Sequence, residues 1–466
     1  MVCVLLYSHP LTQPHSHMTN EAAPRSLTTI LLLIGVLSAG WSLSAAAQQA
    51  KPTEPAEPFD PAIHLESFDQ VWNTIKKVHW QPEKVGKSWD EAKATFRPQV
   101  ESAKSIQDVR VALSDMLNTL DQSHFGIIPN AQYEEANEVK GKGGKGTAGI
   151  EIRLIDGELV VTRVFEDLPA SKANIQPGWQ VKLIGNRTAE EILTGAKKVG
   201  EQSVLRLETA TGLVCDARTS GDIGEKLALA FVDNDDKVHL EYLELAKGPG
   251  KEGRFGNLPP FNVNFEEKLL PDDIGYIAFN SFLGGPQMAQ QYADAVSTWQ
   301  KENRQGLIID LRGNRGGLML LVNAMCGWLT SDRESIGTMT MAGGNFMKMV
   351  LNPRRPKFDK PVAVLTDGCS ISAAEVMAGG IKDLGLGRIF GSKTAGLVLP
   401  STVVRLPNGD GFQYALSSWE SASGESIEGI GVIPDEEILL DREMLSKHAD
   451  PVLSAAKKWI LEENKN

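Results

Sequence analysis

Ser372 stands where a nucleophile could work, at the expected junction between a strand and a helix. The apolar run at residues 361–365 indicates a buried strand, and a short polar turn follows it. Beyond the turn, apolar residues recur at helical spacing: Val376, Met377, Ile381 and Leu384. A hydroxyl at a helix start lies near backbone N–H groups and the positive end of the helix dipole. That setting favours the negative charge that develops when a nucleophile attacks a carbonyl.

The same segment also fits a structural role. Ser372-Ala-Ala-Glu375 has the spacing of a capping box, in which the serine caps the helix and Glu375 reaches back. Helix caps are far commoner than nucleophiles, so this segment alone favours capping. Cys369 precedes the expected helix and is more typical of packing at a strand end than of a nucleophile.

His124 is the histidine whose surroundings best suit a catalytic base. It follows a helical pattern directly and lies in a polar turn before an apolar run. The other histidines beyond residue 47 fall near the start, at a helix end, in an alternating strand and near the carboxyl tail: His64, His79, His239 and His448. Because a lone histidine is most often structural, His124 needs partners elsewhere in the chain to support a catalytic role.

The elements that would carry His124 are helical. Residues 61–130 predict a small domain of about three helices, since apolar residues recur on one face of each. Ser123 and His124 lie at its end. Residues 48–60, rich in Pro and Glu, predict a disordered spacer before it.

The amino end has the features of a secretory signal. Arg25 precedes a short apolar core and then small residues, and we expect cleavage after Ala47. Met18 is an alternative start that would leave a signal of ordinary length. The apolar core is short for a membrane span, and no later stretch is long enough to be one. Residues 1–47 therefore predict export, to the periplasm or beyond.

Composition narrows the function classes. The chain has 466 residues, 42% of them hydrophobic, which allows two or three globular domains. The formal net charge of -12 argues against a nucleic-acid partner, because phosphate binding needs a basic face. The cysteines beyond the signal are odd in number and widely spaced: Cys215, Cys326 and Cys369. Isolated buried thiols are favoured over a metal site, with one disulfide as the alternative.

A β-rich module is expected in the middle of the chain. Residues 131–146 include a Gly/Lys run that predicts a flexible hinge. After it, residues 149–154 and 159–164 alternate in hydropathy around the turn Asp156-Gly157. The pattern predicts paired strands within a module at 145–248.

The front of this module, about residues 145–190, resembles a PDZ domain. The resemblance rests on the paired strands, a short helix after Pro169-Ala170 and the turn Pro177-Gly178. It implies a groove that adds an extended peptide to a sheet edge, with N–H groups near Gly149 and Ile150 receiving a terminal carboxylate. A structural β module without peptide binding is the alternative.

The last domain is expected at residues 262–445, after a linker at 246–262 and before a C-terminal helix at 446–466. Strand and helix patterns alternate here, which predicts a parallel-rich α/β layer. In such sheets sites form at the carboxyl ends of strands, where both Gly316-Gly317 and Ser372 would lie.

Five motifs, in order, resemble the tail-specific (C-terminal processing) serine peptidase family. They are Gly275-Tyr-Ile, Ile309-Asp-Leu-Arg-Gly-Asn-Arg-Gly-Gly317, Ser370-Ile-Ser-Ala-Ala-Glu375, Gly391-Ser-Lys-Thr-Ala-Gly396 and Ile427-Glu-Gly-Ile-Gly-Val-Ile-Pro-Asp435. The resemblance implies a multidomain α/β protein with an N-terminal helical domain, a PDZ-like β domain and a crotonase-like ββα peptidase core. It implies that Ser372 is the nucleophile, and we expect no metal or other cofactor.

The motifs also indicate a branch of this family. The branch best known for trimming protein tails has a lysine base after a Thr-Phe-Gly turn, but Thr394-Ala-Gly is followed here by Leu397. The branch similar to the tricorn core protease uses a Ser–His pair and a glutamate. Ser123 and His124 match the pair, and Glu428 matches the glutamate.

This branch implies a role for each residue. His124 takes the proton of Ser372 and returns it to the leaving amine, while Glu428 orients His124 directly or through Ser123. The oxyanion hole is expected from the N–H groups of Ala373 and of Gly316 or Gly317. Asp310 and Arg312 are expected to stabilise the turn that leads to Gly316 and Gly317, and not to react.

Three functions remain in competition. The first is an exported serine peptidase that cuts peptides or loosely folded proteins, with the PDZ-like domain binding or gating substrate. The second is a catalytically silent scaffold that binds peptides on the same fold. The third is an esterase or other acyl hydrolase that uses the same triad.

Overall fold

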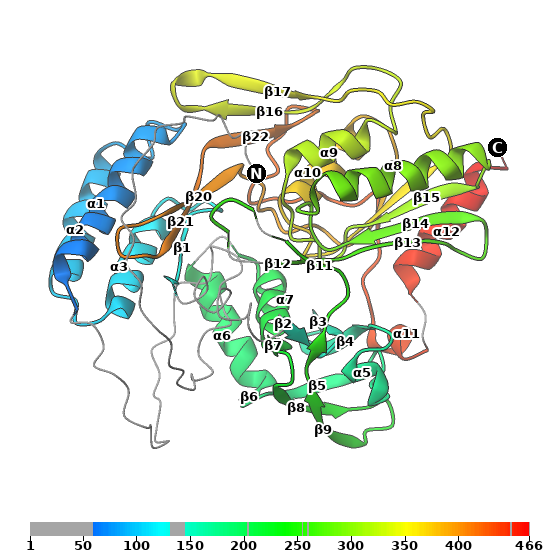
Figure 1. The fold of residues 1–466 in the computed structure, drawn as a ribbon, viewed down its shortest axis with the longest axis horizontal. Coiled ribbons are helices and arrows are strands. Elements are labelled where there is room, and N and C mark those ends of the chain that lie inside the picture. Colours follow the sequence, from blue (N-terminus) through cyan, green and yellow to red (C-terminus); the bar gives the residue numbers. More distant parts are fainter. Residues whose placement is uncertain are drawn as a thin grey trace, which may run out of the picture.

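A six-stranded sheet in the second half of the chain carries the expected nucleophile (Figure 1). The computed structural model describes residues 59–130, 145–202, 205–253, 255–258, 261–447 and 450–465. The strands lie in the order β13-β14-β15-β18-β19-β23, with β13 antiparallel and the others parallel. Their bounds are Phe265–Leu269, Ile274–Phe279, Gly306–Asp310, Val362–Thr366, Arg388–Gly391 and Glu436–Glu437. The predicted parallel-rich layer is confirmed.

Helices cover both faces of this sheet. One face packs against α8 (Gly285–Lys301), α9 (Met319–Cys326) and α10 (Ala373–Asp383), and the other against α12 (Pro451–Glu463). Neighbouring residues of β15 alternate between the two cores, Ile309 toward the first and Ile308 toward the second. Burial on both faces explains why these strands read as continuous apolar runs.

The amino-terminal helices are the three that the sequence predicts. They are α1 (Pro61–Val78), α2 (Lys87–Glu101) and α3 (Ile106–Asn118). The start of α3 is fixed by a capping box between Ser105 and Asp108. The predicted apolar faces are buried, with Phe68 and Val71 of α1 and Leu113 of α3 fully enclosed.

This helical segment is joined to the last part of the chain. β1 (Gly126–Ile128) pairs with β21 (Gly411–Ala415), which pairs with β20 (Ser401–Arg405). The helices share one hydrophobic core with Leu399, Leu406 and Phe412. The turn that carries His124 therefore leads directly into a strand that pairs with β21, in the last part of the chain.

The β-rich module has the strand order β3-β4-β5-β8-β9. The predicted hairpin is present, and α5 and β5 follow it as expected. Two helices, α6 and α7, lie between β6 and β7, where the chain is longer than a minimal PDZ domain needs. The bounds are β2 (Lys145–Thr147), β3 (Ile150–Ile155), β4 (Glu158–Val164), α5 (Pro169–Lys172), β5 (Gln180–Ile184), β6 (Arg187–Thr188), α6 (Ala189–Gln202), α7 (Leu207–Arg218), β7 (Ser220–Asp222), β8 (Lys226–Val232), β9 (Val238–Glu244) and β10 (Ala246–Lys247).

Three segments differ from the sequence-based expectations. A separate sheet in the order β17-β16-β22 was not predicted (Phe346–Val350, Ser335–Met341 and Ser417–Ser421), with the short η2 (Ala342–Gly344) between β16 and β17. The expected linker at 246–262 contains β10 and β11 (Lys251–Gly253), and β11 pairs with β12 (Phe261–Val263). The expected helix at 446–466 is α12, which begins only at Pro451 after its cap Asp450, and a short helix that was not predicted, α11 (Arg442–Ser446), precedes it.

Several expectations fall outside the described residues. These are the signal and most of the spacer, the hinge up to residue 144, and His448. Residues 145 and 146 belong to β2, so the hinge prediction was two residues too long.

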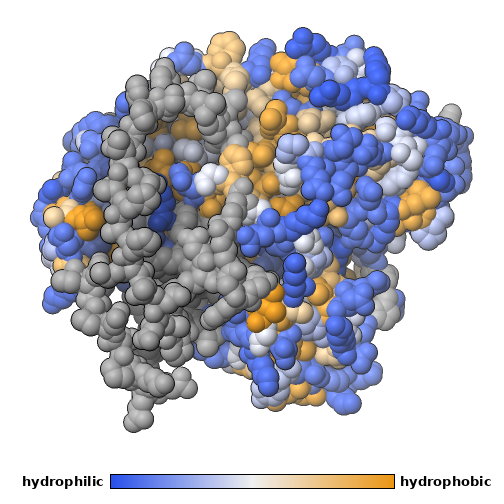
Figure 2. Space-filling model, viewed as in Figure 1, coloured by the Kyte–Doolittle hydropathy of each residue, from blue (hydrophilic) through white to orange (hydrophobic). Residues whose placement is uncertain are grey.

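Within the described part of the chain, no helix is long and apolar enough to cross a membrane. The face drawn in Figure 2 is mostly hydrophilic, with small scattered hydrophobic areas.

Candidate active site

Ser372 occupies a sharp turn between β18 and α10. It is the N-cap residue of α10 and has φ 58° and ψ -117°. Residues other than glycine rarely have a positive φ, so the contacts around Ser372 must stabilise this backbone conformation. Such a turn presents a side chain at the start of the helix, as the sequence predicts.

Glu375 supplies much of that stabilisation. Its side chain is completely buried, and one carboxylate oxygen accepts the Ser372 N–H at 3.0 Å, which is the reach-back half of the predicted capping box. The carboxylate also accepts from Thr394 Oγ1 at 2.7 Å and from the N–H groups of Gly396 and Leu397 at 2.6 and 2.9 Å. Burial raises the pKa of Glu375 to about 7, although these donors favour its charged form. The sequence did not predict the last three bonds.

The glycine turn lies directly against the nucleophile. A Cβ atom added to Gly316 would lie 2.7 Å from Ser372 Cβ and 3.0 Å from the Ala373 nitrogen. Asn314 holds the two segments together, because its carbonyl accepts the Ile371 N–H at 2.9 Å and its Oδ1 accepts the Gly316 N–H at 2.9 Å. Only glycine allows this close approach.

The predicted role of Asp310 and Arg312 is consistent with their contacts. Asp310 is buried and accepts from Arg312 Nε at 3.0 Å and from Tyr276 Oη at 2.8 Å. Arg312 also bonds both carboxylate oxygens of Asp450, at 3.0 and 2.8 Å. The arginine thus fixes the start of the glycine turn to the cap of α12.

Ser123, His124 and Glu428 come together from opposite ends of the chain. Ser123 is buried, and its N–H donates to Glu428 Oε1 at 2.8 Å. Its hydroxyl lies 2.7 Å from His124 Nδ1. Glu428 therefore reaches His124 through Ser123.

His124 can serve as a base in only one of its two neutral tautomers. The role requires that Nδ1–H of His124 donates to the Ser123 hydroxyl, which lies 2.7 Å away. Nε2 then carries the lone pair that a base needs. Burial lowers the pKa of His124 from 6.5, which keeps the ring neutral at pH 7. Burial raises the pKa of Glu428, while N–H groups of Val398 and Ser123 oppose that shift.

Consecutive amides connect the two groups of residues. The Leu397 N–H donates to Glu375, and the Val398 N–H donates to Glu428 Oε2 at 2.9 Å. The Gly429 N–H donates to the Gly396 carbonyl at 2.8 Å. We call Ser372, Glu375, Ala373 and Gly316 the nucleophile end, and Ser123, His124 and Glu428 the base end. Residues 396–398 and 428–429 join them.

The remaining candidates lie elsewhere. The Gly149 N–H donates to Thr147 Oγ1 at 3.1 Å, and Ile150 begins β3. Cys215, Cys326 and Cys369 are buried and free, as predicted, and burial raises the pKa of Cys369 to about 12, far from a reactive thiolate. Among the residues that the structure describes, no cluster of His, Cys, Asp and Glu could hold a metal ion.

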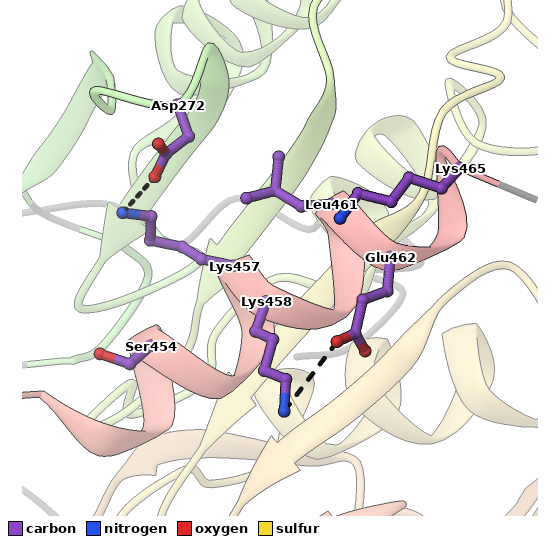
Figure 3. A pocket seen from close by; sticks show the side chains of 7 residues that line it. All are labelled: Asp272, Ser454, Lys457, Lys458, Leu461, Glu462 and Lys465. Atoms are coloured by element: carbon purple, nitrogen blue, oxygen red, sulfur yellow. Dashed lines mark ion pairs between the residues drawn. The ribbon is translucent and has the colours of Figure 1, made fainter.

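A surface hollow on α12 is separate from this site (Figure 3). Its charged side chains include Lys457, which pairs with Asp272 at 2.5 Å, and Lys458, which pairs with Glu462 at 3.9 Å. It contains none of the predicted catalytic residues.

Comparison with known proteins identifies the family. Residues 273–438 match peptidase family S41, and residues 61–118 match the tricorn protease C1 domain. The carboxy-terminal processing protease CtpA of Bacillus subtilis (strain 168) is 23% identical over 352 residues, 76% of this chain and 68% of that protein. The putative tricorn protease homolog 2 of Streptomyces coelicolor is 25% identical over 422 residues, 86% of this chain and 33% of that protein.

Solved structures share the fold. The photosystem II D1 C-terminal processing protease has a TM-score of 0.54 at 20% identity, covering 82% of this chain and 94% of that one. Mature CPAF has a TM-score of 0.55 at 13% identity, covering 86% and 97%. Residues 273–438 are therefore similar to peptidase family S41, and the curated relatives are named as processing proteases.

Proposed function

We propose that the protein hydrolyses peptide bonds with Ser372 as nucleophile, His124 as base and Glu428 as the group that orients the base. One observation carries the assignment of the base. His124 Nδ1 is bonded to Ser123, which is bonded to Glu428, while a buried leucine, Leu397, stands at the position of the family's lysine. A leucine side chain cannot accept a proton, so a base must come from another segment.

In this proposal the reaction has two stages, acylation and deacylation. His124 Nε2 takes the proton of Ser372 Oγ as this oxygen bonds the scissile carbonyl carbon, giving a tetrahedral oxyanion. The C–N bond then breaks, and the imidazolium returns the proton to the leaving amine. Water, deprotonated by His124, hydrolyses the acyl-enzyme and regenerates Ser372. The Glu428 carboxylate favours the imidazolium through Ser123.

The oxyanion hole combines two N–H groups in this proposal. Ala373 is the first residue of α10, so its N–H has no acceptor within the helix. The second donor in this proposal is the N–H of Gly316 or of Gly317, and the Gly316 N–H also donates to Asn314 Oδ1 at 2.9 Å. Gly317, with φ 138°, adopts a backbone conformation suited to glycine.

The substrates in this proposal are proteins or peptides, because the curated relatives are named as processing proteases. We propose export to the periplasm or beyond, supported by the signal-like residues 25–47. Expression in a bacterium with a periplasm, followed by amino-terminal sequencing, tests this. A mature chain that begins at Gln48 supports export, whereas a retained residue 18 or 1 contradicts it.

A fluorophosphonate probe tests the catalytic assignment. Wild type should be labelled and should cut casein, whereas Ser372→Ala should lose labelling and at least about 10³-fold of the activity. A wild type that is neither labelled nor active supports the scaffold alternative. Hydrolysis of short esters without hydrolysis of casein or a peptide library supports the esterase alternative.

A further inference from the structure

β3 is the edge strand of the β-rich module, and α7 packs alongside it (Figure 1). This is the pair of elements between which the resemblance to a PDZ domain would place a peptide. Arg153 of β3 spans the pair, because its Nη1 donates to Asp216 of α7 at 2.9 Å. Arg153 is only 6% exposed.

Polar groups that a peptide would need are already bonded within the module. An added strand binds through backbone N–H and carbonyl groups at the sheet edge. The Ile152 carbonyl accepts from Arg153 Nη1 at 3.0 Å. The Ala148 N–H donates to the Thr219 carbonyl at 2.9 Å, and the Gly149 N–H donates to Thr147 Oγ1. A carboxylate entering here would have to break these bonds.

The turn before Ser372, residues 367–371, lies against the same elements. Thr209 Oγ1 donates to the Gly368 carbonyl at 2.7 Å, and Arg153 Nε lies 3.4 Å from Asp367 Oδ2. A Cβ atom added to Gly212 of α7 would lie 2.5 Å from Cys369 Sγ. The helix and the turn are therefore sterically matched. We call Arg153, Thr209, Gly212 and Asp216 the clamp face.

The clamp face also reaches the glycine turn. Asp367 Oδ1 accepts the N–H groups of Gly313 and Cys369, each at 2.9 Å, while Oδ2 faces Arg153. Asp216 bonds Arg315 as well as Arg153. The two segments that flank Ser372 are thus tied to one arginine and one aspartate of the β-rich module.

We propose that the clamp face binds the chain's own nucleophile turn in place of a substrate tail, and that Arg153 is a positioning residue for Ser372. This inference rests on the proposed function, and it opposes the prediction that Gly149 and Ile150 bind substrate. The β-rich module acts through the geometry of the nucleophile and not through peptide capture.

Kinetics of Arg153 variants provide the first test. Arg153→Ala should lower kcat per probe-titrated site about tenfold or more, with KM within about threefold, because an interaction that orients the nucleophile affects the chemical step. Arg153→Lys should not restore kcat, since an ammonium cannot match the fork of a guanidinium. Arg187→Ala, at a half-buried arginine of the same module that pairs with Glu191 at 3.1 Å, is the matched control and should match wild type.

Titration with the fluorophosphonate probe counts the folded active sites. A purely structural loss would therefore lower the number of active sites and leave kcat per site unchanged. Thr209→Val keeps the shape of α7 and removes the bond to Gly368, so it provides a milder variant if Arg153→Ala does not fold. It should lower kcat about threefold. Unchanged kcat in folded Arg153→Ala or Thr209→Val, or a change in KM alone, overturns the proposal.

Hydrogen exchange provides the second test. Ser372→Ala protein is mixed with an unstructured decapeptide that has a free carboxylate, and separately with its amidated form. We expect no carboxylate-dependent protection of residues 148–153. Such protection overturns the proposal. If wild type neither reacts with the probe nor cleaves protein, the proposed function fails, while this exchange experiment still decides whether the groove binds peptides.

Discussion

Ser372 and His124 are held by neighbours of very different origin along the chain. The nucleophile end depends on Glu375, three residues away, and on the glycine turn of the next strand in the same sheet. The base end depends on a bond between Ser123 and Glu428, which are 305 residues apart. The nucleophile end thus contains a local capping box, to which the glycine turn and the clamp face add long-range contacts, whereas the carboxylate of the base end comes from a distant segment.

Among these predictions, the replacement of His124 is expected to lower kcat most. His124→Ala removes the proton acceptor and should lower kcat about 10³-fold or more, with the fold retained. His64→Ala, at a buried histidine of α1, serves as the control for loss of a ring. Comparable kcat values for wild type and His124→Ala would show that the base end is not catalytic.

Replacing Glu428 should have the next largest effect. Glu428→Gln keeps the shape but loses the charge that favours the imidazolium, and it should lower kcat roughly 10²-fold. Glu425→Gln is a nearby exposed control. Steady-state kinetics on one peptide substrate checks both variants, and equal losses in the two would remove the special role of Glu428.

The link between the helical segment and the hairpin β20–β21 can be broken at one ion pair. Arg110 bonds both oxygens of Asp410, at 3.0 and 2.7 Å, and Asp410 is fully buried. Asp410→Asn should destabilise the fold by about 3 kcal/mol, because it leaves a guanidinium without its counter-charge. Urea unfolding measures the free energy of unfolding. The control is Lys87→Ala, which removes one partner of an exposed ion pair and should change this free energy by no more than about 0.5 kcal/mol. A smaller change in Asp410→Asn than in the control would contradict this account.

Restoring the family's lysine should have the smallest effect. Leu397→Lys should not raise activity, and it should not rescue His124→Ala, because the nucleophile of this chain is paired with a base end that uses histidine. Casein hydrolysis by the single and double variants checks this. A gain in either would move the assignment to the lysine branch.

Predictions from sequence were best where a feature depends on neighbouring residues. The strand–turn–helix around Ser372, the hairpin around Gly157 and the three amino-terminal helices all follow from periodicity and caps, and they are confirmed. The resemblance to C-terminal processing peptidases agrees with the match of residues 273–438 to peptidase family S41. The catalytic roles of Ser372, His124 and Glu428 stay predictions that the geometry supports.

Features that depend on distant partners were missed. The β16–β17–β22 sheet brings Met339 beside Trp419, and no local pattern indicates which strands will pair. Arg110 and Asp410 are ordinary charged residues until the fold buries them together. Glu375 looked like a helix cap, and only the folded chain shows that its carboxylate also anchors the turn at 394–397.

The adjacent amides of Leu397 and Val398 have a consequence for how activity would be lost. The Leu397 N–H that donates to Glu375 and the Val398 N–H that donates to Glu428 belong to consecutive peptide units. Any displacement of this dipeptide, by heat, denaturant or a bound inhibitor, withdraws a donor from both carboxylates at once. Inactivation should therefore be a single concerted event, with no partly active species in which only one carboxylate has lost its donor.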